Sequence, residues 1–141
     1  MTRKILLIDD EVAFLFPMQK MLGGAGLAVD TAESFDQAIA MIDSVHYDAV
    51  IADVRLGGAM SREGLAILDH VRSRDSATRV IIMTGFGSSD VMCAAYRKKA
   101  DCYFEKPVSF RMLAGALNKL GVLVPGTEPA LAGSAAARRA G

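Results

Sequence analysis

The sequence has little of several features that mark large classes of protein. It contains two cysteines, no tryptophan and no apolar run near the roughly 20 residues that a membrane-spanning helix needs. Cys93 and Cys102 match no metal-ligand spacing, and two cysteines in a chain with a sufficient core indicate reduced, packed thiols. We therefore expect a soluble protein without membrane insertion and without a disulfide.

Neither sign of charge is in excess. Sixteen Lys and Arg residues balance sixteen Asp and Glu residues, so the formal net charge is zero. Such a balance gives no extended field that would attract nucleic acid or an anionic membrane, and no direct nucleic-acid binding is expected. We also expect no secretion signal, because the short apolar run after Lys4 ends in carboxylates.

The chain does have enough apolar residues for one core. Its 141 residues, 52% of them hydrophobic, fit one domain and leave no room for a second folded output domain. We expect this domain to occupy residues 1–121. After Leu120 the composition shifts to Pro, Gly, Ser and Ala, which bury little apolar surface, so residues 122–141 are expected to form a flexible tail or linker.

Short aliphatic runs alternate with longer stretches of helical period. This alternation predicts βαβ units, in which helices cover both faces of a parallel sheet. The middle runs are almost wholly apolar, as strands buried on both faces must be, and the second and fifth strands are expected at the edges. The predicted strands are Lys4–Ile8, Leu27–Thr31, Asp48–Ala52, Arg79–Met83 and Asp101–Phe104, and the predicted helices are 12–24, 34–45, 61–74, 88–99 and 109–120.

Polar side chains stand at the ends of four of the five predicted strands. Asp9 and Asp10 follow the first strand, and Asp53 ends the third. Thr84 follows the fourth strand, and Lys106 follows the fifth. Because ligands of open parallel sheets bind beyond the carboxyl ends of the strands, we expect these side chains to converge. Carboxylates that meet beside one lysine repel each other unless a hard cation lies among them, so the pattern predicts a Mg²⁺ site with room for a phosphate oxygen.

From about Lys4 to Leu120 the chain resembles the receiver domains of bacterial two-component response regulators, a chemotaxis-regulator-like family. Each motif alone is weak, whereas the ordered set is specific. The resemblance implies an α/β, doubly wound (βα)5 fold of the flavodoxin-like kind, with a five-stranded parallel sheet of order 2-1-3-4-5. The motifs that carry it are Ile8-Asp9-Asp10-Glu11, Ile51-Ala52-Asp53, Met83-Thr84-Gly85 and Tyr103-Phe104-Glu105-Lys106-Pro107.

The resemblance also implies a role for each residue of the site. Asp53 would accept a phosphoryl group from a sensor histidine kinase, a phosphotransfer protein or a small acyl phosphate. Asp10, Asp53 and the backbone carbonyl of Arg55 would bind Mg²⁺ or Mn²⁺, and Asp9 would act through a water molecule. Lys106 would pair with Asp53 at rest and with the phosphoryl oxygens afterward.

Two further residues would respond to phosphorylation. Thr84 would bind a phosphoryl oxygen and move inward, and the Tyr103 ring would turn into the space that it leaves. The resulting signal would pass through the fourth helix, fifth strand and fifth helix, either to a downstream protein target or to a second copy in a homodimer. The resemblance further implies a cytoplasmic location and a cis Lys106–Pro107 bond.

Other interpretations of the same residues stay open. Taken alone, Asp9 and Asp10 are more typical of helix caps than of a metal site, and Asp53 is typical of a turn after a strand. A metal-dependent phosphohydrolase that uses an aspartyl phosphate would need a second acidic residue two positions after its nucleophile, and that position is Arg55. A phosphorylation-independent interaction module would keep the acids unused, and a flavodoxin-like electron carrier would need a phosphate cradle that the first loop lacks. We expect a non-enzymatic switch with at most weak autophosphatase activity.

Some positions depart from the family pattern. The loop after Asp53 is longer, with Gly58-Ala59-Met60 as the excess, and Gly64 takes the place of the expected glycine. Lys99 stands where a glycine usually ends the fourth helix, so that helix is expected to end differently. Pro17 lies inside the first predicted helix and should kink it or delay its start.

Overall fold

The computed structural model describes residues 2–58, 61–85 and 88–123, in which five strands alternate with five helices. All ten predicted elements form, and their ends differ from the predicted ones by at most two residues. The strands are β1 (Lys4–Ile8), β2 (Ala28–Ala32), β3 (Ala49–Asp53), β4 (Arg79–Thr84) and β5 (Cys102–Glu105). The helices are α1 (Val12–Gly24), α2 (Phe35–Ser44), α3 (Glu63–Arg74), α4 (Ser89–Arg97) and α5 (Phe110–Lys119).

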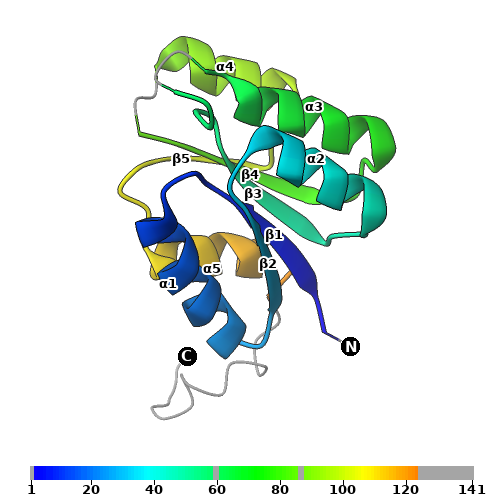
Figure 1. Ribbon diagram of the computed structural model, residues 1–141, viewed down its shortest axis with the longest axis vertical. Coiled ribbons are helices and arrows are strands. Elements are labelled where there is room, and N and C mark those ends of the chain that lie inside the picture. The colour runs from blue at the N-terminus through cyan, green and yellow to red at the C-terminus, as the bar shows by residue number, and fades with distance from the viewer. Residues whose placement is uncertain (1, 59–60, 86–87, 124–141) are drawn as a thin grey trace.

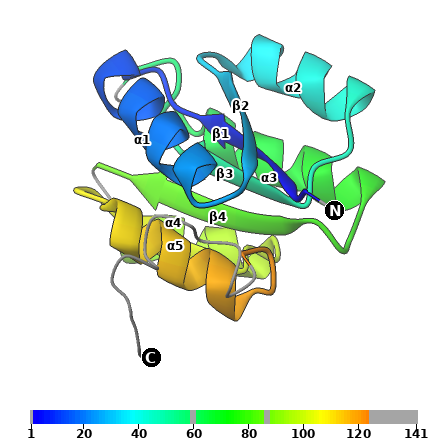
Figure 2. The same cartoon turned by 90° about the horizontal axis from the view of Figure 1, so that it is seen from below.

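The strands form one parallel sheet of order β2-β1-β3-β4-β5, with β2 and β5 at its edges. Figure 1 shows α2, α3 and α4 on one face of the sheet and α1 and α5 on the other. In Figure 2, which is turned by 90°, α1 and α5 lie in front of the sheet. The predicted flavodoxin-like (βα)5 fold and its strand order are therefore confirmed.

Alternate residues of each central strand enter different layers of the core. On β1, Leu6 and Ile8 pack with residues of α2 and α3, whereas Ile5 and Leu7 pack with residues of α1 and α5. All four side chains are fully buried. Burial on both faces explains why this strand reads as a continuous apolar run.

The structure also places Pro17 and the two cysteines within these elements. The helix α1 begins at Val12 with Pro17 inside it, so the proline does not delay its start. Cys93 and Cys102 are both free thiols; Cys102 is partly buried, whereas Cys93 is exposed and not packed as predicted. Among the residues that the structure describes, no helix is long and apolar enough to cross a bilayer.

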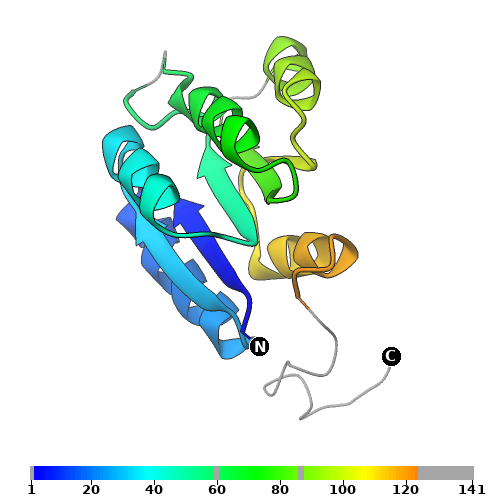
Figure 3. The same cartoon turned by 90° about the vertical axis from the view of Figure 1, so that its right-hand side faces the viewer.

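The chain stays packed for a short distance after α5. Val122 and Leu123, which the predicted tail includes, are buried in the layer between the sheet and α1 and α5. Their backbone N–H groups both donate to the carbonyl oxygen of Leu117, at 2.9 and 3.1 Å. In Figure 3 this end of the chain lies on the same side of the molecule as the start of β1. The rest of the predicted tail, 124–141, lies outside the described residues.

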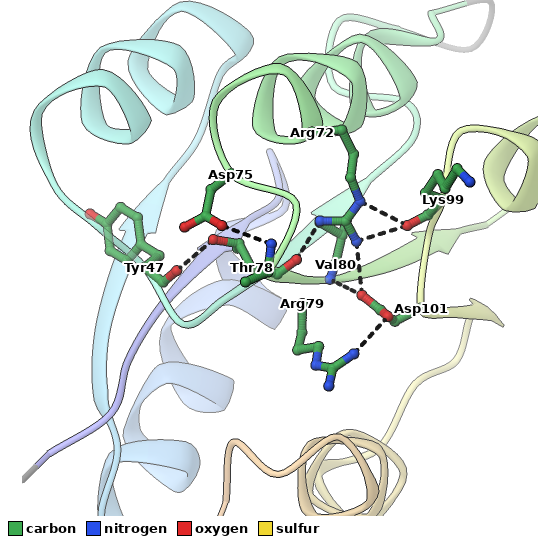
Figure 4. A network of polar contacts seen from close by, with 9 residues as sticks. Tyr47, Arg72, Asp75, Thr78, Arg79, Val80, Lys99 and Asp101 are labelled. Carbon is green, nitrogen blue, oxygen red and sulfur yellow. Dashed lines mark hydrogen bonds and ion pairs between the residues drawn. The ribbon is translucent and has the colours of Figure 1, made fainter.

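A polar network at the amino ends of β4 and β5 holds α3 to the connection between α4 and β5 (Figure 4). Arg72 of α3 donates hydrogen bonds to the carbonyl oxygens of Thr78 and Lys99. Its guanidinium also pairs with Asp101 at 2.9 Å, and the backbone N–H of Val80 donates to the same carboxylate at 2.8 Å. One guanidinium with several donors thus fixes the backbone around Lys99 against the start of β4.

Lys99, in this network, has the left-handed conformation that glycine favours, with φ of +75°. A side chain with a Cβ is strained there by about 1–2 kcal/mol, whereas glycine loses more entropy on folding. Lys99→Gly is therefore expected to raise the free energy of unfolding by about 0.5–1 kcal/mol in urea titrations. Lys99→Ala keeps the strain and should change stability by less than about 0.5 kcal/mol. Equal gains in the two variants would contradict the strain argument.

Candidate functional site

The carboxyl ends of β1 and β3 and the residue after β5 bring several predicted site residues together. Asp9, Asp10 and Asp53 each offer a carboxylate oxygen, and these oxygens all lie within 4.8 Å of one another. The ammonium nitrogen Nζ of Lys106 lies 2.6 Å from Asp9 Oδ2 and 3.1 Å from Asp53 Oδ2. Asp9, Asp10, Asp53 and Lys106 thus lie together at this edge of the sheet. We call the three carboxylates the acid cluster.

Backbone hydrogen bonds fix the positions of the main-chain atoms that carry these side chains. The N–H of Asp9 donates to the carbonyl oxygen of Ala32 at 3.1 Å, which continues the pairing of β1 with β2 by one residue. The N–H of Lys106 donates to the carbonyl oxygen of Thr84 at 2.8 Å, which does the same for β4 and β5. The Lys106–Pro107 peptide bond is cis, as expected. The sheet itself therefore determines the spacing of the site.

The acid cluster combines buried and exposed carboxylates. Asp9 is fully buried and Asp53 is almost fully buried, whereas Asp10 is exposed. Burial raises the pKa of Asp9, although contact with Lys106 opposes the shift. Partial desolvation and the neighbouring Asp53 carboxylate raise the pKa of Asp10. Negative charge is thus in excess at this edge, which favours a bound cation.

Lys106 balances part of this charge. Its Nζ also lies 2.8 Å from Glu11 Oε1, so three carboxylates contact one ammonium. Burial disfavours the charged ammonium, but the hydrogen bonds to Asp9 and Glu11 outweigh it and raise the pKa of Lys106. The same hydrogen bond lowers the pKa of Glu11. Lys106 therefore carries its charge at neutral pH.

The raised pKa of Asp9 has a consequence for stability. Its carboxyl binds a proton more readily in the folded chain than in the unfolded chain, so the charged form opposes folding at neutral pH. Asp9→Asn is therefore expected to raise the free energy of unfolding by roughly 0.5–2 kcal/mol at pH 7 without metal. This gain should shrink as the pH falls and vanish below about pH 4, where the carboxyl is protonated in both states. Urea titrations of both proteins across this pH range would measure it, and a gain that grows toward acid pH would contradict the assignment.

The donor set of the acid cluster fits a hard divalent cation. Asp10 and Asp53 offer carboxylate oxygens, the ligand type that Mg²⁺ and Mn²⁺ prefer. One oxygen of Asp53 is held in place, because the backbone N–H of Arg55 donates to Oδ1 at 3.0 Å. The N–H of Glu11 donates in the same way to Asp9 Oδ1 at 2.9 Å. The carboxylates are thus oriented by the backbone, and the metal role of the Arg55 carbonyl stays a prediction.

Thr84 and Tyr103, the predicted switch residues, lie on the two neighbouring strands. Thr84 ends β4 and is buried. The ring of Tyr103 on β5 is partly buried, packs against the core layer of α2, α3 and α4, and lies 6.5 Å from the ring of Tyr96, centroid to centroid. Its hydroxyl is buried and has no hydrogen-bond partner within 2–58, 61–85 and 88–123. The movement of either side chain on phosphorylation stays a prediction.

The start of α3 lies directly against the backbone of Asp53. Gly64 donates its N–H to the carbonyl oxygen of Val54 at 3.0 Å. A Cβ on Gly64 would collide with the carbonyl oxygen of Asp53 and with the Cα of Val54. Only glycine allows this approach, which accounts for the residue at this position. Ala59 and Met60, in the longer loop before it, lie outside the described residues.

Two residues that contact Lys106 had no role in the sequence prediction. Glu11 pairs with its ammonium, and the ring centroid of Phe14 lies 5.1 Å from Nζ. Glu11 is the N-cap residue of α1 and Phe14 lies in its first turn, a proximity that the predicted helix start could have suggested. The strand end that this segment meets depends on how α1 packs, and the sequence pattern does not contain that information.

Comparison with protein families gives one match that covers most of the chain. The model of the response regulator receiver domain matches residues 5–118. The DNA-binding transcriptional regulator NtrC of Salmonella typhimurium is 31% identical over 103 residues, which make up 73% of this chain and 21% of NtrC. The chain spans between 21% and 58% of the length of such curated relatives. Their similarity therefore concerns one domain of longer proteins.

Solved structures have the same fold. A response regulator receiver domain protein from Clostridium thermocellum is 32% identical, with a TM-score of 0.73 over 84% of this chain and 93% of that one. A response regulator protein from Burkholderia pseudomallei is 23% identical, with a TM-score of 0.73 over 91% of this chain and 70% of that one; its crystal structure contains a phosphorylated aspartic acid, a calcium ion and citrate. The sheet order, the acid cluster and the match over residues 5–118 agree, and the chain belongs to the response regulator receiver domain family.

Proposed function

We propose that this chain is a signalling switch in which Asp53 accepts a phosphoryl group. The observation that carries the proposal is the almost fully buried Asp53 carboxylate, which has two acids within 4.8 Å and the Lys106 ammonium at 3.1 Å. A carboxylate oxygen of Asp53 attacks the phosphorus atom, and the bond from phosphorus to the donor nitrogen or oxygen breaks. Lys106 offsets the negative charge of the phosphoryl oxygens during this transfer.

The proposed metal ligands are the carboxylates of Asp10 and Asp53 and the backbone carbonyl of Arg55, while Asp9 acts through a water molecule. When bound, Mg²⁺ or Mn²⁺ neutralises charge between the acids and the incoming phosphoryl group. The excess negative charge of the acid cluster supports this proposal. The structure from Burkholderia pseudomallei supports it further, since that protein of the same fold holds both a phosphorylated aspartic acid and a divalent cation.

The proposed phosphoryl donor is a sensor histidine kinase or a phosphotransfer protein in the cytoplasm. Thr84 then binds a phosphoryl oxygen, and Tyr103 follows it inward. The output surface is formed by α4, β5 and α5, and it contacts a downstream protein target or a second copy of the chain. The proximity of the Tyr103 ring to exposed Tyr96 on α4 supports this route, because a change in one ring alters the packing of the other.

Phosphorylation by acetyl phosphate tests the proposal without a cognate kinase. The full chain is incubated with acetyl phosphate and Mg²⁺, and its intact mass is measured. We expect the wild type to gain the mass of one phosphoryl group, and to gain none when a chelator removes Mg²⁺. Asp53→Asn should gain none, whereas Asp36→Asn, which changes an exposed acid on α2, should behave as the wild type does.

The same experiment separates the alternatives. A phosphoryl group on Asp53→Asn would contradict the assignment of the acceptor. Wild type that takes up no phosphoryl group would favour an interaction module that works without phosphorylation. Rapid, repeated hydrolysis of acetyl phosphate would favour a metal-dependent phosphohydrolase, for which Arg55 stands where a second acid is expected.

A further inference from the structure

The ammonium of Lys106 has no N–H left for a new partner. An ammonium group has three donors, and three carboxylates lie within hydrogen-bond distance of Nζ. The two shorter distances, 2.6 and 2.8 Å, lead to Asp9 and Glu11, on the segment that enters α1. The longest, 3.1 Å, leads to Asp53. A phosphoryl group attached to Asp53 must therefore compete for a cation that is drawn toward α1.

The first turn of α1 strengthens this attraction. Phe14 follows Glu11 by three residues, and its ring centroid lies 5.1 Å from Nζ, which is within the range of a cation–π contact. Glu11 is the N-cap residue of α1 and Phe14 lies in its first turn, with the Phe14 N–H donating to the carbonyl oxygen of Glu11 at 3.0 Å. The carboxylate and the ring therefore approach the ammonium from the same segment. Together they favour one resting position of the Lys106 side chain.

The three carboxylates differ in the free energy that each loses when its contact with Lys106 breaks. Asp9 is fully buried, and a buried carboxylate that loses its partner is strongly disfavoured. Asp53 is the residue to which the phosphoryl group would be attached. Glu11 has a side chain that is 65% exposed, so water can replace the ammonium at little cost. Glu11 is therefore the partner that gives way when Lys106 turns to a phosphoryl oxygen.

We propose that Glu11 is a resting-state restraint on Lys106, which holds the ammonium toward α1 and releases it when a phosphoryl group arrives. The inference rests on the proposed function, since it concerns the same site. Glu11 acts through Lys106 and is a positioning residue. It weakens the binding of phosphoryl-like anions by the unmodified site, and so favours the inactive form until phosphorylation occurs.

Beryllofluoride, a non-covalent mimic of a phosphoryl group, provides the test. Its apparent Kd is measured at saturating Mg²⁺ for the full-length wild type, Glu11→Gln and Glu11→Asp. Loss of one exposed ion pair corresponds to a change of roughly two- to fivefold, so both variants should bind the probe more tightly by this factor. Glu11→Asp keeps the charge but is shorter by one methylene group, which breaks the contact. Glu33→Gln removes the same charge from another exposed residue after a strand and should leave the Kd unchanged.

A second readout separates the contact from the charge. The Mg²⁺ affinity, measured without beryllofluoride, should be unchanged in Glu11→Asp, because the charge near the acid cluster is kept. If only Glu11→Gln binds the probe more tightly, the charge alone governs binding and the restraint is rejected; it is also rejected if neither variant differs from the wild type. A wild type that binds no beryllofluoride and takes no phosphoryl group from acetyl phosphate would reject the proposed function itself.

Discussion

Lys106→Met is expected to lower the free energy of unfolding by about 3–5 kcal/mol at pH 7. The substitution keeps much of the side-chain volume but removes the shared partner of Asp9 and Asp53, two buried carboxylates. Breaking a buried pair in this way leaves uncompensated charge in a region of low dielectric constant. Urea titration of the metal-free protein measures the effect. Mg²⁺ should restore part of the lost stability, since a cation bound among the acids replaces the missing charge.

Lys98→Met is the matched control for this prediction. Lys98 Nζ lies 2.7 Å from Asp69 Oδ2, which is as close as the contacts of Lys106, but Asp69 is exposed and Lys98 is partly exposed. Exposed pairs of this kind contribute at most about 1 kcal/mol. Lys106→Met should therefore lower the free energy of unfolding several times as much as Lys98→Met does. Similar losses in both variants would show that burial of the acid cluster does not govern its energetics.

Gly64→Ala is expected to destabilise the domain by about 3 kcal/mol or more, although it adds a single methyl group. The added Cβ would meet the backbone of Asp53 and Val54, which cannot turn away as a flexible side chain can. Either α3 or the end of β3 must move, and both changes displace the Asp53 carboxylate. We therefore expect weaker Mg²⁺ binding in addition to a lower midpoint of urea unfolding.

The same substitution at Gly115 is expected to have the opposite effect on stability. Gly115 lies in the interior of α5, is exposed, and has nothing within 4 Å of an added Cβ. Because alanine favours helix over glycine by about 1 kcal/mol, this variant should be more stable than the wild type. Equal stability of Gly64→Ala and Gly115→Ala would contradict the steric role of the close approach between Gly64 and β3.

The sequence predicts most of this fold because its pattern is redundant. The run Ala49–Asp53 is apolar up to its final carboxylate, as a central strand buried on both faces requires, and it forms β3. Similar runs alternate with amphipathic stretches along the chain, so an error in one element would not have changed the prediction of a parallel sheet covered by helices on both faces. The full strand order came from the family resemblance. The convergence of Asp9, Asp53 and Lys106 follows from the same logic, since the carboxyl ends of parallel strands lie at one edge.

The details that the sequence did not predict depend on packing between distant segments. Glu11 and Phe14 reach Lys106 because the start of α1 lies against the residue after β5, and no local pattern specifies this. The change in composition after Leu120 placed Val122 in the predicted tail. It is buried because Gly121, with φ of +81°, lets the chain reverse after α5. The average composition of neighbouring residues does not reveal a chain reversal that depends on a single glycine.

The most direct test of the account identifies the side chain that carries the phosphoryl group. Reduction of an aspartyl phosphate with borohydride yields homoserine, and fragmentation of the resulting peptides locates that residue. After incubation with acetyl phosphate and Mg²⁺, we predict homoserine at position 53 and at no other position, and none when Mg²⁺ is removed. Homoserine at the position of Asp9 or Asp10, or its absence from a protein that has gained phosphoryl mass, would contradict the account.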